Sequence, residues 1–186
     1  MALTRRCRLV VISLLALCLP ACGGGGGGGG KTPTQPATPT VTFQPAGSGG
    51  PGTITLGAGA GSGVSRLYLE VRANQVAGLY GLAFDLRFPA AQLRFERGTE
   101  GVVLNTDGAA TSLQVAAGEN GHLVVGLTRL GAVSGVTATG PLLTLELVPV
   151  ASGSGTFAFS ANAAYDERAA VLDEVVWQAG SVEIRL

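Results

Sequence analysis

The chain has 186 residues, including 30 Gly, 9 Pro, 3 Cys and a single His, and only 13% of its residues are charged. Twelve Lys and Arg residues balance twelve Asp and Glu residues, so the formal net charge is zero. That balance argues against nucleic-acid binding, which needs a basic surface to replace phosphate counterions. The length allows one domain of ordinary size.

The N-terminal segment predicts an export signal that ends at a lipidated cysteine. A positive stretch with three arginines precedes the apolar run 9–19. Eleven residues rise only about 16 Å as a helix, too little to cross a bilayer, so the run is typical of a signal peptide. The sequence Leu-Pro-Ala-Cys that ends at Cys22 resembles the bacterial lipobox. We expect 1–21 to be a lipoprotein signal peptide and the protein to be lipid-anchored at the outer membrane or cell surface; an ordinary signal peptide is the alternative.

Residues 22–52 predict a flexible tether behind the lipidated cysteine. Residues 23–30 are eight consecutive Gly, and the rest is mainly Pro, Thr, Gly and Ser. This composition cannot bury enough apolar surface to offset its ordering entropy, and random-coil scaling gives the segment an end-to-end distance of about 30 Å. Cys7 and Cys18 would leave with the signal, so no intramolecular disulfide is expected. Loss of the three signal arginines would leave nine basic and twelve acidic residues, a net charge of −3.

Alternation of apolar and polar residues from residue 66 onward predicts β-strands. It is clearest in 66–74 and 82–88, and it recurs in five shorter runs, 93–95, 123–127, 143–147, 157–159 and 182–186. One-sided alternation is typical of antiparallel sheets packed as a sandwich. With a weak first strand at 53–56, we expect an all-β, eight- to nine-stranded antiparallel β-sandwich over 53–186. The stretch 169–177 fits a short helix or two short strands equally well.

Three segments carry a family resemblance: Gly78–Leu93, Thr139–Val148 and Gly180–Ile184. Their patterns and order are similar to those of a cohesin domain, a jelly-roll module of the superfamily that also holds several carbohydrate-binding modules. In the first segment Phe88-Pro89 stands where the family has Tyr-Asp-Pro. Cohesins bind dockerins, small helical modules that carry calcium. The resemblance therefore implies a protein partner, with calcium on that partner and no cofactor on this chain.

The resemblance also implies a docking surface on one flat sheet, made of the family's third, fifth, sixth and eighth strands. The outward residues mapped onto it here are Asp85, Arg87, Gln114, His122, Val124, Thr128, Thr156 and Ala158. A mixed surface of polar and small residues suits docking of a helical module, although any one of these residues fits an ordinary solvated strand face as well. The implied function is a membrane-anchored, non-catalytic module that docks a dockerin-bearing or other exported protein. A structural subunit of an envelope assembly would use the same face.

A carbohydrate-binding module of the same superfamily is the alternative function. Such modules stack sugars on exposed aromatic rings, and the candidates here are Tyr68, Tyr80 and Trp177, with Tyr165 as a further ring. Aromatic residues make up only 5% of the chain, and most of them are Phe residues at inward positions. This alternative requires two or three of the rings to line up on one surface.

Catalytic and metal-binding residues are sparse. The chain has one His, no Gly-x-Ser-x-Gly nucleophile elbow, and no second His to complete a histidine metal site. We therefore predict no enzyme activity and no metal site. An acidic cluster, Asp166, Glu167, Asp173 and Glu174, fits a solvated rim better than a cation site.

Overall fold

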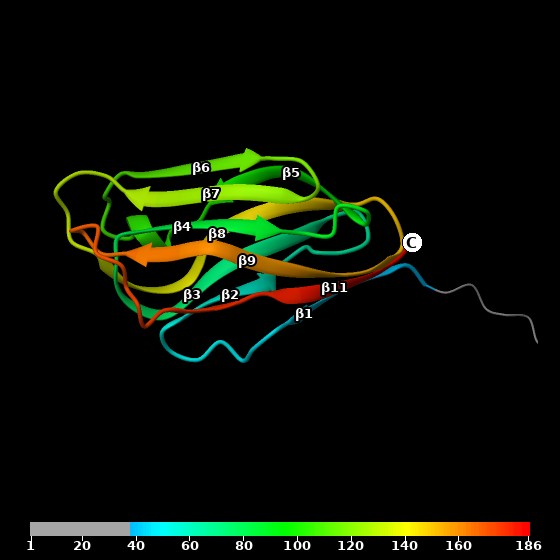
Figure 1. The fold of residues 1–186 in the computed structure, drawn as a ribbon, viewed down its shortest axis with the longest axis horizontal. Helices are drawn as coiled ribbons and strands as arrows, with labels where there is room; N and C mark the ends of the chain where they lie inside the picture. Colours follow the sequence, from blue (N-terminus) through cyan, green and yellow to red (C-terminus); the bar gives the residue numbers. More distant parts are fainter. Residues whose placement is uncertain (1–37) are drawn as a thin grey trace, which may run out of the picture. The chain divides into compact units, whose positions relative to one another are not determined.

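Two β-sheets pack face to face in the computed structural model, which describes residues 38–186 (Figure 1). From edge to edge, the six-stranded sheet contains β1 (Thr40–Pro45), β11 (Gly180–Arg185), β9 (Gly153–Tyr165), β4 (Gly81–Arg87), β7 (His122–Arg129) and β6 (Thr111–Ala117). The five-stranded sheet contains β10 (Val176–Gln178), β2 (Thr53–Ala58), β3 (Leu67–Leu79), β8 (Val136–Pro149) and β5 (Leu93–Glu100). A short 3-10 turn, η1 (Val103–Asn105), follows β5. The predicted all-β sandwich is confirmed.

The core lies between the sheets and follows the alternation of the sequence. Inward positions of the central strands are almost fully buried: Leu67, Leu69, Val71, Leu82, Phe84, Leu86, Leu123, Val125, Leu127, Leu143, Leu145 and Leu147. Full burial of one such side chain contributes about 1.5–3 kcal/mol. These are the apolar positions of the alternation predicted in 66–74, 82–88, 123–127 and 143–147, so that alternation correctly separates buried from outward residues in β3, β4, β7 and β8. All strand pairs are antiparallel except β10 with β2, which is parallel.

The domain begins earlier than the sequence predicted. Residues 40–45 fall within the predicted tether, yet they form β1, which pairs with β11 from Thr40 opposite Arg185 to Pro45 opposite Gly180. Val41 and Phe43 pack against the core, and the Phe43 ring lies 5.6 Å from that of Phe157. Two apolar residues are enough to hold this strand in place, because β11 supplies the hydrogen-bond partners that the backbone of 40–45 lacks by itself. Residues 1–21, Cys22 and the octaglycine lie outside the described residues.

The structure also resolves two other points of the strand assignment. Within 38–186 it has eleven strands, more than the predicted eight or nine, because β1 and the short β10 are added. The ambiguous stretch 169–177 contains no helix: Val171 bridges to Tyr165, and Val176–Gln178 forms β10 beside β2. In the described part of the chain, no helix has the length and apolar character needed to cross a membrane.

A buried arginine holds the loop between β5 and β6 against the sheet. The Arg129 side chain, at the end of β7, is fully buried; it donates hydrogen bonds to the Leu104 carbonyl and, at 2.5 Å, to Asp107 Oδ2. Its Nε has no hydrogen-bond partner. Because a buried guanidinium is costly unless paired, Asp107 is the residue that makes its position tolerable.

Replacing Phe43 with alanine tests whether β1 is part of the domain. We expect Phe43→Ala to lower the free energy of unfolding by about 2 kcal/mol, because it removes a half-buried ring from the core. Gln44→Ala, an exposed neighbour on the same strand, should change it by less than about 0.5 kcal/mol. Urea unfolding measures both. Equal small effects would place the domain boundary after β1.

The Asp107–Arg129 pair predicts a pH dependence of stability. The hydrogen bond from Arg129 holds the pKa of Asp107 below its ordinary value of 3.8. A carboxyl whose folded-state pKa is lowered contributes stability that is present above pH 3.8 and is lost as the pH falls through the folded-state pKa. Asp107→Asn should therefore lower the melting temperature at neutral pH and reduce its loss on acidification. Asp173→Asn, which changes an exposed carboxyl, is the matched control and should do neither.

Candidate functional site

The outer face of β9, β4, β7 and β6 forms an ordered lattice of side chains. Strand register places the outward residues in four rows: Tyr165, Gly81, Thr128 and Ser112; Ala163, Ala83, Gly126 and Gln114; Ser160, Asp85, Val124 and Ala116; and Ala158, Arg87 and His122. The strands lie side by side in this order in Figure 1. We call this surface the β9-β4-β7-β6 face.

Polar contacts gather in one half of this face. Asp85 Oδ2 and His122 Nε2 lie 2.9 Å apart, joining β4 to β7. Arg87 is exposed, lies opposite both His122 and Ala158 in register, and makes no ion pair within the described part of the chain. Val124, in the neighbouring row on β7, is 48% exposed. This half therefore offers a carboxylate, an imidazole and a guanidinium around an apolar centre.

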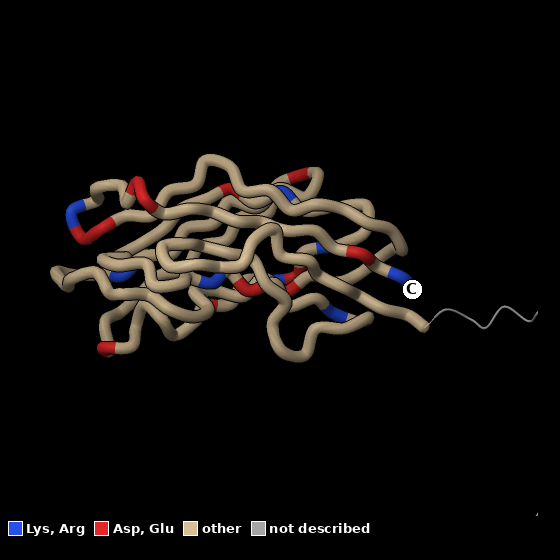
Figure 2. The backbone as a smooth tube through the Cα atoms, turned by 90° about the horizontal axis from the view of Figure 1, so that it is seen from below, with Lys and Arg blue, Asp and Glu red and all other residues tan. Residues whose placement is uncertain are grey.

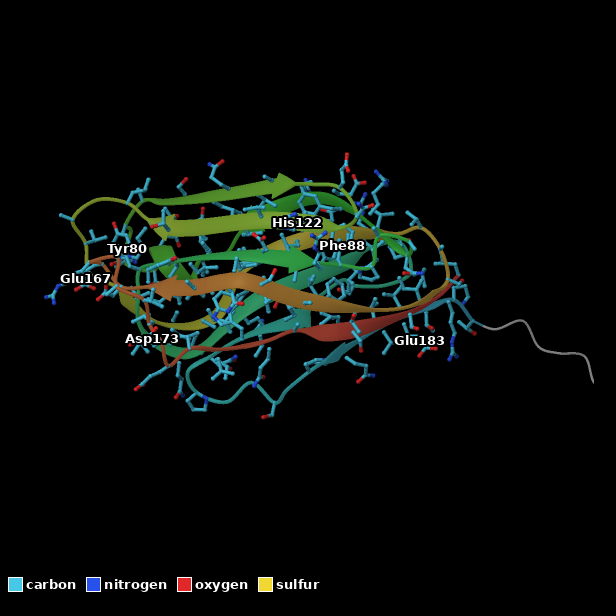
Figure 3. The ribbon with its side chains drawn as sticks, viewed as in Figure 1. Tyr80, Phe88, His122, Glu167, Asp173 and Glu183 are labelled. Carbon is cyan, nitrogen blue, oxygen red and sulfur yellow. The ribbon has the colours of Figure 1, made fainter. Side chains whose placement is uncertain are left out.

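The other half of the face is hollow. A groove of about 450 Å³ lies over Gly81, Ala83 and Gly126, with Tyr80 and Tyr165 among the residues that line it. A Cβ atom added to Gly126 would meet no atom within 4 Å, so the space above this strand is open. Figure 3 places Tyr80 at one end of the molecule and His122 further along the sheet. The two halves of the face thus differ in relief as well as in charge.

A β-bulge in β9 forms one wall of the groove. Phe157 and Phe159 face the core, and strict alternation would turn Tyr165 inward as well. The pairing of β9 with β4 shifts between Ala83 and Asp85, and Ala161 has a positive φ of 47°. Beyond the bulge Ala164 is buried instead, so Tyr165 points outward.

The outer face of the other sheet has a different character. Glu146, only 5% exposed, forms ion pairs with Arg66 and with Arg97, whose Nε lies 2.8 Å from Glu146 Oε2. Two further pairs, Glu70 with Arg72 and Glu96 with Arg94, lie on the same sheet. Figure 2 shows that long stretches of the backbone elsewhere carry no charged residue. Most charges of the five-stranded sheet are thus paired with one another, whereas the β9-β4-β7-β6 face is mostly small and uncharged.

The structure brings the predicted docking residues together on one face. Asp85, Arg87, His122 and Val124 belong to its polar half, and Gln114 and Thr128 line the groove. Thr156 and Ala158 are exposed on β9. The sequence did not predict Gly81, Ala83, Gly126 and Ser112 as part of this face. The available signal was that small residues occupy outward positions on the neighbouring strands β4, β7 and β6.

Of the four rings named for the carbohydrate alternative, Tyr80 and Tyr165 share the groove, whereas Tyr68 and Trp177 lie elsewhere. Trp177 packs into the core, with its ring 5.6 Å from Phe84 and 5.0 Å from Phe159. Tyr68 lies on the outer side of the five-stranded sheet beside Arg66 and Glu146. Tyr80 lines the groove and donates a 2.7 Å hydrogen bond from its hydroxyl to the Gly131 carbonyl. The required platform of aligned rings is therefore not formed by these three residues.

The acidic cluster divides into two places. Asp166 Oδ1 accepts hydrogen bonds from the N–H groups of Arg168 and Ala170, both at 2.8 Å, and Asp166 lines the groove with Glu167. Asp173 and Glu174 line a separate hollow beside residues 75–77. Across residues 38–186, no three His, Cys, Asp or Glu side chains are grouped so that they could hold a metal ion.

The Asp85–His122 pair should be dispensable for folding. Half-exposed ion pairs contribute about 0–1 kcal/mol, so Asp85→Asn and His122→Ala should each lower the free energy of unfolding by less than about 1 kcal/mol. Leu86→Ala, an inward neighbour on β4, should lower it by about 3 kcal/mol because it opens a cavity. Denaturant titration measures all three. A loss at Asp85 or His122 comparable with that of Leu86→Ala would show that the pair is structural.

Comparison with known proteins identifies the fold. No protein-family profile matches the sequence, and no curated protein matches it. Among solved structures, CaCohA2 of Clostridium acetobutylicum, in a complex with CaDoc0917, superposes with a TM-score of 0.59 at 15% identity, covering 72% of this chain and 99% of its own.

Two further solved structures are similar. The type II cohesin A11 of Bacteroides cellulosolvens has a TM-score of 0.56 at 8% identity, over 69% of this chain and 95% of its own. The sixth cohesin of scaffoldin B from Acetivibrio cellulolyticus, in complex with the Cel5 dockerin, has a TM-score of 0.53 at 15% identity, over 75% and 96%. The sandwich of residues 38–186 therefore has a cohesin-like fold.

Proposed function

We propose that this chain is a non-catalytic, membrane-anchored module that docks an exported protein, with a dockerin-bearing protein as the specific candidate. The observation that carries this proposal is the contrast between the two outer faces. One sheet pairs its charges internally around Glu146, whereas the β9-β4-β7-β6 face exposes small residues around Val124, together with an Arg87 that forms no ion pair in the described chain. A face of this kind loses little solvation when it is covered.

The cohesin-like fold supports the proposal. Two of the similar cohesins were solved as complexes, CaCohA2 with CaDoc0917 and the scaffoldin B cohesin with the Cel5 dockerin. The predicted docking residues of this chain lie on neighbouring strands of one sheet, as a single docking surface requires. In this proposal calcium would belong to the partner.

The placement of the termini of the domain is consistent with anchoring through Cys22. Strand β1 starts at Thr40 opposite Arg185, at the end of the sheet where β9 begins. The groove lies at the other end of β9, and its thirteen residues span about 40 Å. Within the domain, the groove therefore lies at the end of β9 opposite to the end at which β1 begins.

Calcium-dependent binding is the direct test of the proposal. The full chain, immobilised for surface plasmon resonance, is titrated with a panel of dockerin modules in calcium and in a calcium chelator. We expect saturable binding in calcium to at least one module and its loss in chelator. Val124→Arg should weaken that binding at least about tenfold, because it places a long charged side chain at the centre of the face.

The control uses the same substitution on the other sheet. Val176, on β10, is 55% exposed, close to the 48% of Val124. Val176→Arg should leave the affinity unchanged. Equal weakening by both variants, or binding by no module, would contradict the proposed function. Binding of a partner that carries no dockerin, with loss in Val124→Arg alone, would favour the envelope-assembly role.

A further inference from the structure

The groove over Gly126 has a shape and composition of its own within the face. Its floor is formed by Gly81, Ala83 and Gly126, which carry at most one side-chain carbon each. Glycine in the interior of a strand weakens the strand and often marks a close approach by another molecule. Here Gly126 lies opposite Ala83, which in turn lies opposite Ala163, so three adjacent strands carry small residues at the same level, with Gln114 on the other side of Gly126.

The backbone beneath the groove restricts what can bind there. Strand β4 is paired on both sides, by β7 and β9, and β7 is paired by β4 and β6. The N–H and C=O groups of both strands are therefore occupied within the sheet, so an extended peptide lying over them could not form strand-to-strand hydrogen bonds; such pairing is open only along the outer side of the edge strand β6. An occupant must satisfy its own backbone groups, which a helix does internally.

The charges of the groove are of one sign. Asp166 and Glu167 are among its lining residues, and no Lys or Arg is; Arg168 follows Glu167 in sequence but does not line the groove. The Asp166 carboxylate is fixed at the rim by the N–H groups of Arg168 and Ala170. Glu167 lies at the same end of the molecule as Tyr80 (Figure 3). The remaining lining is largely apolar, with the rings of Tyr80 and Tyr165.

We propose, on the basis of the proposed docking function, that this groove is the anchor pocket of the β9-β4-β7-β6 face. It binds an amphipathic helix of the partner that places an aliphatic side chain over Gly126 and, one helical turn away, a Lys or Arg beside Asp166 and Glu167. A volume of about 450 Å³ accommodates more than one side chain, and residues one turn apart lie on the same side of a helix.

Three synthetic helical peptides serve as probes in a fluorescence anisotropy titration with the full chain. They differ at two positions one turn apart, which hold leucine and lysine, leucine and glutamate, or alanine and lysine. We expect the leucine–lysine peptide to bind most tightly and each of the other two to bind about tenfold more weakly. Equal affinities for the three, or no binding, would overturn the proposal.

Variants of the chain locate the binding. Gly126→Val fills the groove with a residue that favours strands, and it should weaken binding of the leucine–lysine peptide at least about tenfold. Gly63→Val is the matched control, because Gly63 also has open space around it but lies in the loop before β3. Glu167→Gln, a change at an exposed side chain that keeps an oxygen to accept the Gly135 N–H, should weaken binding of the same peptide about threefold and leave binding of the leucine–glutamate peptide unchanged or slightly tighter.

The outcomes separate this inference from the function on which it rests. If the leucine–lysine peptide binds Gly126→Val and Gly63→Val equally, the groove is not the anchor pocket, while the dockerin titration with Val124→Arg still decides the docking function. If octylammonium displaces the peptide at an equal concentration, the groove is a site for small cationic amphiphiles and the proposal of a helical occupant is overturned. Loss of peptide binding in Gly126→Val alone supports the proposal.

Discussion

Burial of one face of each sheet in a shared core is the constraint on which the rest of this structure depends. Phe84 and Leu86 on β4 meet the core from one side, and Leu69 and Leu145 on β3 and β8 enter it from the other. Because side chains alternate along a strand, every inward residue determines that its neighbours point outward. The core therefore determines which positions of each strand face outward, including those of Asp85 and Arg87.

One departure from regular alternation occurs where the candidate site is built, and others lie in the five-stranded sheet. The bulge in β9 moves Tyr165 from the inward to the outward side, and it does so with Ala161 at a positive φ, a conformation that is unfavourable for a residue with a side chain. Bulges are common next to functional sites because they redirect a side chain without changing the fold. The same face also contains Gly126, which a purely structural strand would replace with a larger residue.

The cohesin-like fold and the low sequence identity are compatible because the fold is specified by pattern and not by particular residues. At 8–15% identity, alternating apolar positions and turn residues are enough to build the same sandwich. Surface residues follow no such constraint, so the groove and the Asp85–His122 pair must be argued from this chain itself. Likeness of fold carries no function by itself, so the chemistry of the face has to define which partner it would suit.

The sequence alone determined the all-β class, the inward residues of the central strands and the exposure of Asp85 and Arg87, because these follow from a local period of two. It did not reveal β1, since Val41 and Phe43 become a strand only when β11, far along the chain, supplies their hydrogen bonds. It also could not place Tyr80, Gln114, Gly126 and Tyr165 around one groove. That arrangement depends on the register between four strands and on one bulge, which only the tertiary structure decides.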